Sequence, residues 1–148
     1  MDKLYSQATI RGMKEKYDFR FSKSLGQNFL TDGNLIAKIV DGAEIAEGDA
    51  VIEIGPGMGA LTAEIAERAA AVLAVEIDHH LIPILKETLG AFENTEILQG
   101  DIMKADIGEL IVRVREKAGN NNASVKVLGN LPYYITTPIL LKLLKEEG

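Results

Sequence analysis

Four short runs rich in aliphatic residues alternate with helical segments along this chain of 148 residues. The runs that we predict as strands are residues 50–54, 71–75, 96–98 and 125–128. The predicted helices are residues 32–44, 61–69, 80–89, 107–117 and 136–147. Strands separated by helices are typical of right-handed crossovers, which produce a parallel sheet with helices on both faces. The sequence therefore predicts an α/β fold of the Rossmann-like kind.

A glycine-rich segment follows the first predicted strand. Residues 53–59 read EIGPGMG, and glycines at these positions let the backbone turn sharply and approach a ligand closely. Gly55, Gly57 and Ala60 also satisfy the dinucleotide-binding fingerprint. The segment alone therefore fits a nicotinamide cofactor and S-adenosylmethionine equally well, and a plain strand-to-helix turn is a third interpretation.

Polar residues follow the other predicted strands. Parallel sheets bind ligands beyond the carboxyl ends of their strands, so these residues are candidate ligand contacts. Glu76 follows the second strand and suits ribose hydroxyls, because a carboxylate accepts strong hydrogen bonds. Asp101 follows the third strand and could accept from an adenine amino group, although a lone aspartate there is more often a turn or cap residue. The fourth strand leads into Asn130-Leu131-Pro132-Tyr133.

This last segment carries a specific resemblance. It resembles the Asn/Asp-Pro-Pro-Tyr motif of methyltransferases that act on exocyclic amino groups. With SLGQNFL at residues 24–30 and ITTP at residues 135–138, the chain from about residue 23 is similar to the ribosomal small-subunit RNA adenine N6-dimethyltransferases. The resemblance implies a class I methyltransferase fold, S-adenosylmethionine as cofactor, and this chain as the N-terminal, cofactor-binding portion of the enzyme.

The resemblance also implies contacts with the cofactor. Asn28 and Leu30 would lie over it, and the backbone at Gly55 and Gly57 would pass close to its methionine part. In the same way, Glu76 would bind the ribose and Asp101 the adenine amino group. Without the resemblance, Leu30 reads as a core residue and Asn28 as a turn former.

The same resemblance implies a catalytic role for residues 130–133. The Asn130 side chain, at the boundary between cofactor and base, would also contact the cofactor, and with the Leu131 carbonyl it would hold the hydrogens of the target amino group. Pro132 would fix the backbone so that these acceptors converge. Tyr133 would stack on an adenine turned out of its helix or loop.

Charge is distributed unevenly along the chain. Its net charge is −6, yet Lys and Arg outnumber Asp and Glu in the first 30 residues. We therefore expect residues 1–22 to form a basic arm that can engage RNA phosphates, and residues 23–148 to form the cofactor-binding domain. The chain has no cysteine and no apolar run long enough for a membrane helix, which favours a cytoplasmic protein without membrane contact.

Three other functions stay open at this point. A large-subunit RNA adenine methylase of the macrolide-resistance type shares most of the motifs. A non-catalytic RNA-binding or assembly module would use the basic arm and the same fold. The NAD-binding half of a dehydrogenase is supported by the glycine-rich segment and Glu76, but it would have no use for residues 130–133.

Two further expectations concern partners and metals. The expected partners are ribosomal RNA and the small ribosomal subunit. From the resemblance we expect the family's later strands and its helical domain to be absent here, so strand 125–128 is expected at an exposed edge, where it could mediate self-association. We expect no metal site at His79 and His80, because neighbouring side chains on a helix point apart.

Overall fold

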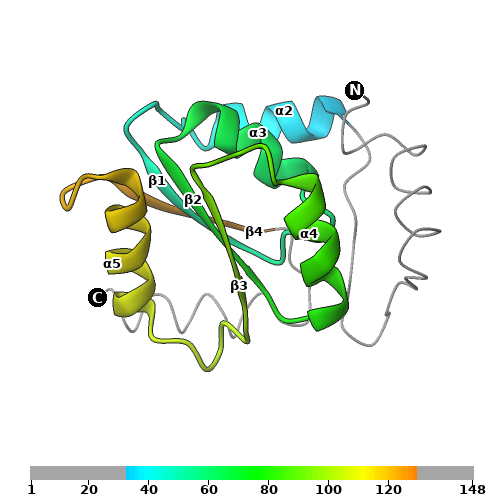
Figure 1. Cartoon of the computed structure of the whole chain (residues 1–148). Helices are drawn as coiled ribbons and strands as arrows, with labels where there is room; N and C mark the ends of the chain where they lie inside the picture. Colours follow the sequence, from blue (N-terminus) through cyan, green and yellow to red (C-terminus); the bar gives the residue numbers. More distant parts are fainter. Residues whose placement is uncertain (1–32, 130–148) are drawn as a thin grey trace.

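The computed structural model describes residues 33–129, and its centre is a parallel sheet of four strands (Figure 1). The strands are β1 (Ala50–Ile54), β2 (Ala71–Glu76), β3 (Thr95–Gln99) and β4 (Val125–Gly129). Their order across the sheet is β3-β2-β1-β4. Each predicted strand is confirmed to within one residue at either end. The predicted arm and the predicted helix 136–147 lie outside the described residues.

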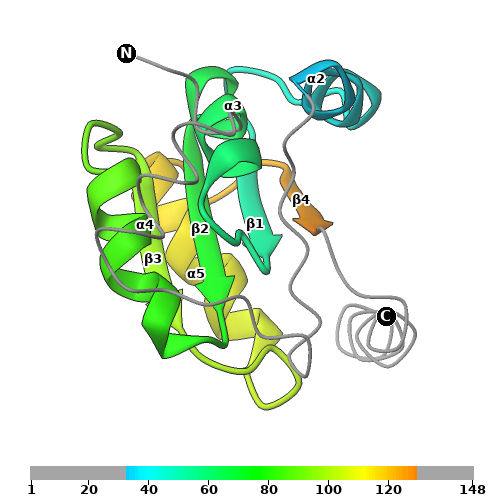
Figure 2. The same cartoon turned by 90° about the vertical axis from the view of Figure 1, so that its right-hand side faces the viewer.

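Helices lie on both faces of the sheet, as predicted. They are α2 (Gly33–Gly42), α3 (Ala60–Arg68), α4 (Ile82–Thr88) and α5 (Ile107–Ala118). Helix α5 packs against one face, while α2, α3 and α4 lie over the other (Figures 1 and 2). Within residues 33–129, no helix has the length and hydrophobicity that a membrane crossing requires.

One predicted helix has a different start. Residues 80–89 were expected to form one α-helix, but the chain first makes a 3₁₀ turn, η2 (His79–Leu81), and α4 begins at Ile82. The Asp78 side chain caps this turn by accepting the His80 amide. Pro83 lies in the first turn of α4, where its missing N–H costs no helical hydrogen bond.

The alternation of side chains along the central strands produces two cores. Ile52 and Leu73 point towards α5, where they pack with Leu110. Val51 and Val72 point to the other face and pack with α2 and α3. Both β1 and β2 are buried along their whole length, because each has a neighbouring strand on either side and helices above and below.

The two ends of helix α5 are determined by the residues that flank it in the sequence. Asp106 caps its first turn by accepting the Glu109 amide at 3.2 Å, and Gly119 ends it in a left-handed conformation with φ of 73°. The predicted polar break at residues 119–122 is confirmed. This helix carries the chain from β3 to β4, across the sheet.

The strand order marks where a ligand is expected. From β1 the chain moves outward to β2 and β3, and it then crosses back to place β4 on the far side of β1. The order therefore reverses at β1, and open α/β sheets bind ligands in the crevice at such a point, beyond the carboxyl ends of the strands.

Candidate functional site

The loop after β1 has a backbone that requires glycine. Gly55, Gly57 and Gly59 have φ of 69°, 62° and 95°, all in the left-handed region that side chains disfavour. The Gly55 amide donates to the Val75 carbonyl at 2.9 Å, which holds the loop beside the end of β2. At Gly59 an added Cβ would lie 3.2 Å from Leu89. Residues 55–59, called the glycine loop below, thus form the predicted sharp turn.

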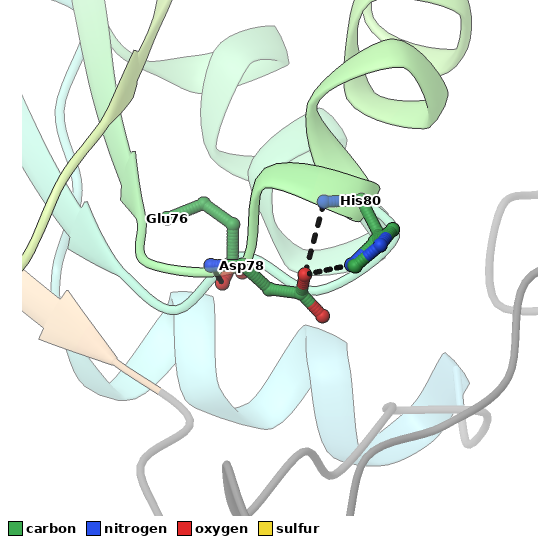
Figure 3. Close-up of polar contacts among 3 residues, drawn as sticks. All are labelled: Glu76, Asp78 and His80. Atoms are coloured by element: carbon green, nitrogen blue, oxygen red, sulfur yellow. Dashed lines mark hydrogen bonds and ion pairs between the residues drawn. The ribbon is translucent and has the colours of Figure 1, made fainter.

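Glu76 lies at the end of β2, buried beside the glycine loop. Its side chain is 4% exposed, and its Oε1 accepts the Gly57 amide at 3.3 Å. Its Oε2 accepts the Asp78 amide at 2.9 Å (Figure 3). Burial raises the pKa of Glu76 above the ordinary range, while these two amides act in the opposite direction. A carboxylate offers about four acceptor sites, so one held by two amides can still bind hydroxyl donors.

Asp101 follows β3 and is next to Glu76 along the same edge of the sheet. The Gly100 amide donates to the Glu76 carbonyl at 2.9 Å, which places the two strand ends side by side. Asp101 Oδ1 accepts the Met103 amide at 2.9 Å, so this residue forms the turn that we weighed as an alternative. Its contact with an adenine stays a prediction.

The other predicted contact residues lie outside the described residues. These are Asn28, Leu30, Asn130, Leu131, Pro132 and Tyr133. The structure does describe the strand that leads to the last four. Gly129, at the end of β4, pairs with Ile54 at the end of β1. Residue 130 therefore follows the strand next to the glycine loop.

Sequence reasoning missed two buried side chains around the glycine loop. Glu53 is 1% exposed and accepts a hydrogen bond from the Thr62 hydroxyl. On the other side, the Thr88 hydroxyl donates to the Met58 carbonyl at 3.1 Å. The signal for Glu53 was present in the sequence, since a carboxyl at an inner position of an apolar strand needs a specific partner. Thr88 carries no such signal.

An exposed apolar residue next to Glu76 was also missed. Ile77 is 47% exposed, directly after the buried carboxyl. A large apolar side chain beside convergent polar groups is typical of a ligand wall. Its signal is an apolar residue placed just beyond a strand rather than within it.

The two neighbouring histidines differ from the expectation. Their rings were expected to point apart, but their centroids lie 4.0 Å from each other, because these residues form a 3₁₀ turn instead of an α-helix. His80 Nδ1 lies 3.0 Å from Asp78 Oδ1 (Figure 3). The possible ligand atoms of Asp78, His79 and His80 lie within 4.8 Å of one another. Both histidines are exposed, and exposed clusters of this kind are common without an ion.

The chain matches the family model described as ribosomal RNA adenine dimethylase over residues 18–148. A protein from Alkaliphilus oremlandii named Ribosomal RNA small subunit methyltransferase A is 56% identical over 147 residues. The protein of the same name from Clostridioides difficile is 53% identical over the same length. Each alignment covers 99% of this chain but only 50% and 49% of the relative. The chain therefore spans about half the length of these curated relatives.

Solved structures show the same fold. The 23S rRNA methyltransferase ErmE has a TM-score of 0.65 and 34% identity, covering 80% of this chain and 43% of that one. A dimethyladenosine transferase from Plasmodium falciparum has a TM-score of 0.59 and 27% identity, covering 77% of this chain and 37% of that one. These likenesses confirm the predicted Rossmann-like methyltransferase fold.

Proposed function

Because the chain belongs to the ribosomal RNA adenine dimethylase family, we propose that it is the S-adenosylmethionine-binding part of an enzyme that methylates adenines of ribosomal RNA. One observation carries the cofactor assignment. The buried Glu76 carboxylate accepts a hydrogen bond from the Gly57 amide. A group that can accept the ribose hydroxyls therefore lies directly beside a glycine loop whose backbone a ligand can approach.

The residues present fit the cofactor. Glu76, already oriented by two amides, accepts the ribose hydroxyls, and Ile77 offers an apolar surface beside it. The glycine loop admits the methionine part, because Gly55 and Gly57 have no side chain to block it. Asp101 addresses the adenine amino group. By the family resemblance, Asn28 and Leu30 would contribute further contacts with the cofactor.

When bound, S-adenosylmethionine supplies a methyl group that is already activated on its sulfonium, so the protein has mainly to align the transfer. Asn130 and the Leu131 carbonyl accept the hydrogens of the adenine amino group and favour a pyramidal nitrogen. Pro132 keeps these acceptors convergent, and Tyr133 stacks on the adenine. Two such transfers give a dimethyl product.

We assign the RNA of the small ribosomal subunit as the substrate. The two curated relatives named Ribosomal RNA small subunit methyltransferase A are 56% and 53% identical to this chain, whereas the solved 23S rRNA methyltransferase is 34% identical. The TM-score of 0.65 to that 23S enzyme supports the large-subunit RNA as the second candidate. Both substrates belong to the same reaction class and use the same cofactor site. Either substrate is consistent with a cytoplasmic protein.

Two proposals about partners accompany this assignment. Basic residues 1–22 bind RNA phosphates, which would make RNA affinity fall steeply with salt. Strand β4 pairs with β1 on one side and stands at one end of the described sheet order, which supports self-association through its other side. A single monomeric mass in light scattering over a wide concentration range would contradict the second proposal.

The cofactor assignment is tested by calorimetric titration of the 148-residue chain with S-adenosylmethionine and with NAD. We expect binding of S-adenosylmethionine alone. Glu76→Gln should weaken it by about tenfold or more, because an amide replaces the charged acceptor. Glu96→Gln, which changes a carboxyl on β3 paired with Arg113, is the matched control and should bind as the unmodified chain does. Binding of NAD, or of neither ligand by a folded chain, would contradict the assignment.

The substrate assignment needs a methyl-transfer assay with the full-length protein. Immature small subunits should accept labelled methyl groups, and large subunits should not. Asn130→Ala should abolish most of the transfer at a saturating concentration of S-adenosylmethionine. Full transfer by that variant would contradict the role of Asn130, and labelling of large subunits would favour the second candidate.

A further inference from the structure

Glu53 is a buried carboxyl beneath the glycine loop that the proposed cofactor contacts do not use. It lies near the carboxyl end of β1, an inner strand of the sheet, where it pairs with Ala74 of β2 and with Leu128 of β4. Its side chain is 1% exposed and accepts from Thr62, which is 0% exposed. Burying a carboxyl is costly unless it is hydrogen-bonded, so this position requires a reason.

Its electrostatic surroundings do not supply that reason. Burial raises the pKa of Glu53 to about 7, and the nearby Glu76 carboxylate acts in the same direction. The Thr62 hydroxyl acts in the opposite direction. In the part of the chain that the structure describes, Glu53 thus lies in a site that disfavours its charge, so an apolar residue would stabilise the strand better.

The position of the bond supplies the reason. Glu53 is two residues before the glycine loop, and Thr62 lies in the first turn of α3, directly after the loop. The bond therefore joins the strand to the helix and closes the segment that contains the loop. Two other contacts hold the loop from its sides, at Gly57 through Glu76 and at Met58 through Thr88.

These three contacts act on different parts of the loop. The Glu76 and Thr88 bonds each hold one backbone group within it. The Glu53–Thr62 bond instead links the strand before the loop to the helix after it. Gly55, Gly57 and Gly59 have positive φ and, as glycines, can adopt many other backbone conformations. Linking the two ends of the loop reduces the number of conformations that the loop can adopt.

We propose that Glu53 is a positioning residue which, through Thr62, holds the glycine loop in the shape that the cofactor needs. This inference rests on the proposed cofactor site but concerns a residue that does not contact the ligand. Glu53 acts as a hydrogen-bond acceptor, and its charge has no part in the role.

The test compares four variants of the 148-residue chain by S-adenosylmethionine titration and by amide hydrogen exchange without cofactor. Thr62→Val removes the hydroxyl and should weaken binding about fivefold or more and speed exchange at Gly57 and Gly59. Thr62→Ser keeps a hydroxyl and should restore both properties. Glu53→Gln keeps an acceptor and should bind within about twofold of the unmodified chain. Thr95→Val on β3 is the matched control and should change neither property.

The outcomes separate this proposal from the cofactor assignment. If the unmodified chain binds no S-adenosylmethionine, the assignment fails, and the exchange rates still decide whether Thr62 orders the loop. A folded Thr62→Val chain with unchanged exchange would overturn the positioning role. Loss of affinity in Glu53→Gln with unchanged exchange would also overturn it, because the charge would then act on the ligand. If Thr62→Val does not fold, Glu53→Met, which removes the acceptor, should weaken binding and speed exchange at Gly57 and Gly59, and unchanged values in a folded Glu53→Met chain would overturn the positioning role.

Discussion

The two ends of the sheet treat their buried carboxyls in opposite ways. At the amino end, just before β1, Asp49 Oδ2 accepts the Ala46 amide at 2.8 Å and lies 2.9 Å from Lys126 Nζ. The Ala46 amide, together with Lys126, holds the pKa of Asp49 below its ordinary value. At the carboxyl end, burial raises the pKa of Glu53 to about 7 and raises that of Glu76 as well.

The direction of the pKa shift shows whether the ionised carboxyl stabilises or destabilises the folded state. A carboxyl whose pKa is lowered by folding stabilises the native state when it is charged, and one whose pKa is raised destabilises it. The costly carboxyls lie beside the glycine loop, on the edge where the ligand is expected. Groups with strongly perturbed pKa values are often found at functional sites, because binding and catalysis use arrangements that are unfavourable for folding.

The largest expected effect concerns Glu53 and pH. Its pKa rises from 4.5 in the unfolded chain to about 7 in the fold, so the folded state binds the Glu53 proton more tightly than the unfolded chain does. The resulting contribution to the free energy of unfolding is fully present below pH 4.5. That stability falls as the pH rises from 4.5 to about 7. Thr62 from α3 and Glu76 from β2 are the groups that act on it. Urea unfolding of the unmodified chain and of Glu53→Gln should therefore diverge with pH.

Relative to Glu53→Gln, the unmodified chain should lose about 3 kcal/mol of unfolding free energy between pH 4.5 and about pH 8. The control is Glu96→Gln, because Glu96 lies on β3 in a pair with the exposed Arg113. A constant difference between Glu53→Gln and the unmodified chain across this range would show that Glu53 is ordinary in the fold, and the contrast between the two ends would be lost.

A smaller effect is expected at the amino end, where Asn94 joins two elements. Its amide donates to the Ala66 carbonyl at 2.9 Å and to the Ala69 carbonyl at 3.1 Å. Asn94→Ala should lower the free energy of unfolding by about 2 kcal/mol, because two carbonyls at the end of α3 lose their donor. Asn120→Ala, at an exposed turn, should cost about 0.5 kcal/mol or less. Equal losses in thermal unfolding would contradict a structural role for Asn94.

The smallest effect concerns the pair of Asp49 and Lys126. Because folding lowers the pKa of Asp49, its stabilisation is present above its ordinary value of 3.8 and is lost as the pH falls through the folded pKa. A double-mutant cycle with Asp49→Asn and Lys126→Met should give a coupling of about 1 kcal/mol at neutral pH. The coupling should decrease as the pH falls progressively below 3.8, and a coupling that stays constant until the chain unfolds would argue against an ionic contribution.

Most of the elements could be predicted because their signals are local. Short aliphatic runs mark β1 and β2, and Asp106 and Gly119 mark the two ends of α5. The glycine loop was also readable, since no other residue tolerates its three positive φ values well. The start of α4 was not readable, because the choice between a 3₁₀ turn and an α-helix depends on how Asp78 is held beside Glu76.

The carboxyls show the limit of such reasoning. The chain alone placed Glu76 and Asp101 after their strands, and the family resemblance connected both with a cofactor. Only the packed sheet shows that Glu53 accepts from Thr62, that Glu76 holds the Gly57 amide, and that Asp101 bonds into its own turn. Periodicity and turn preference act between near neighbours in the chain, whereas the charge state of a carboxyl depends on the atoms that exclude water from it. Those atoms come from separate strands and helices, and only the tertiary structure brings them together.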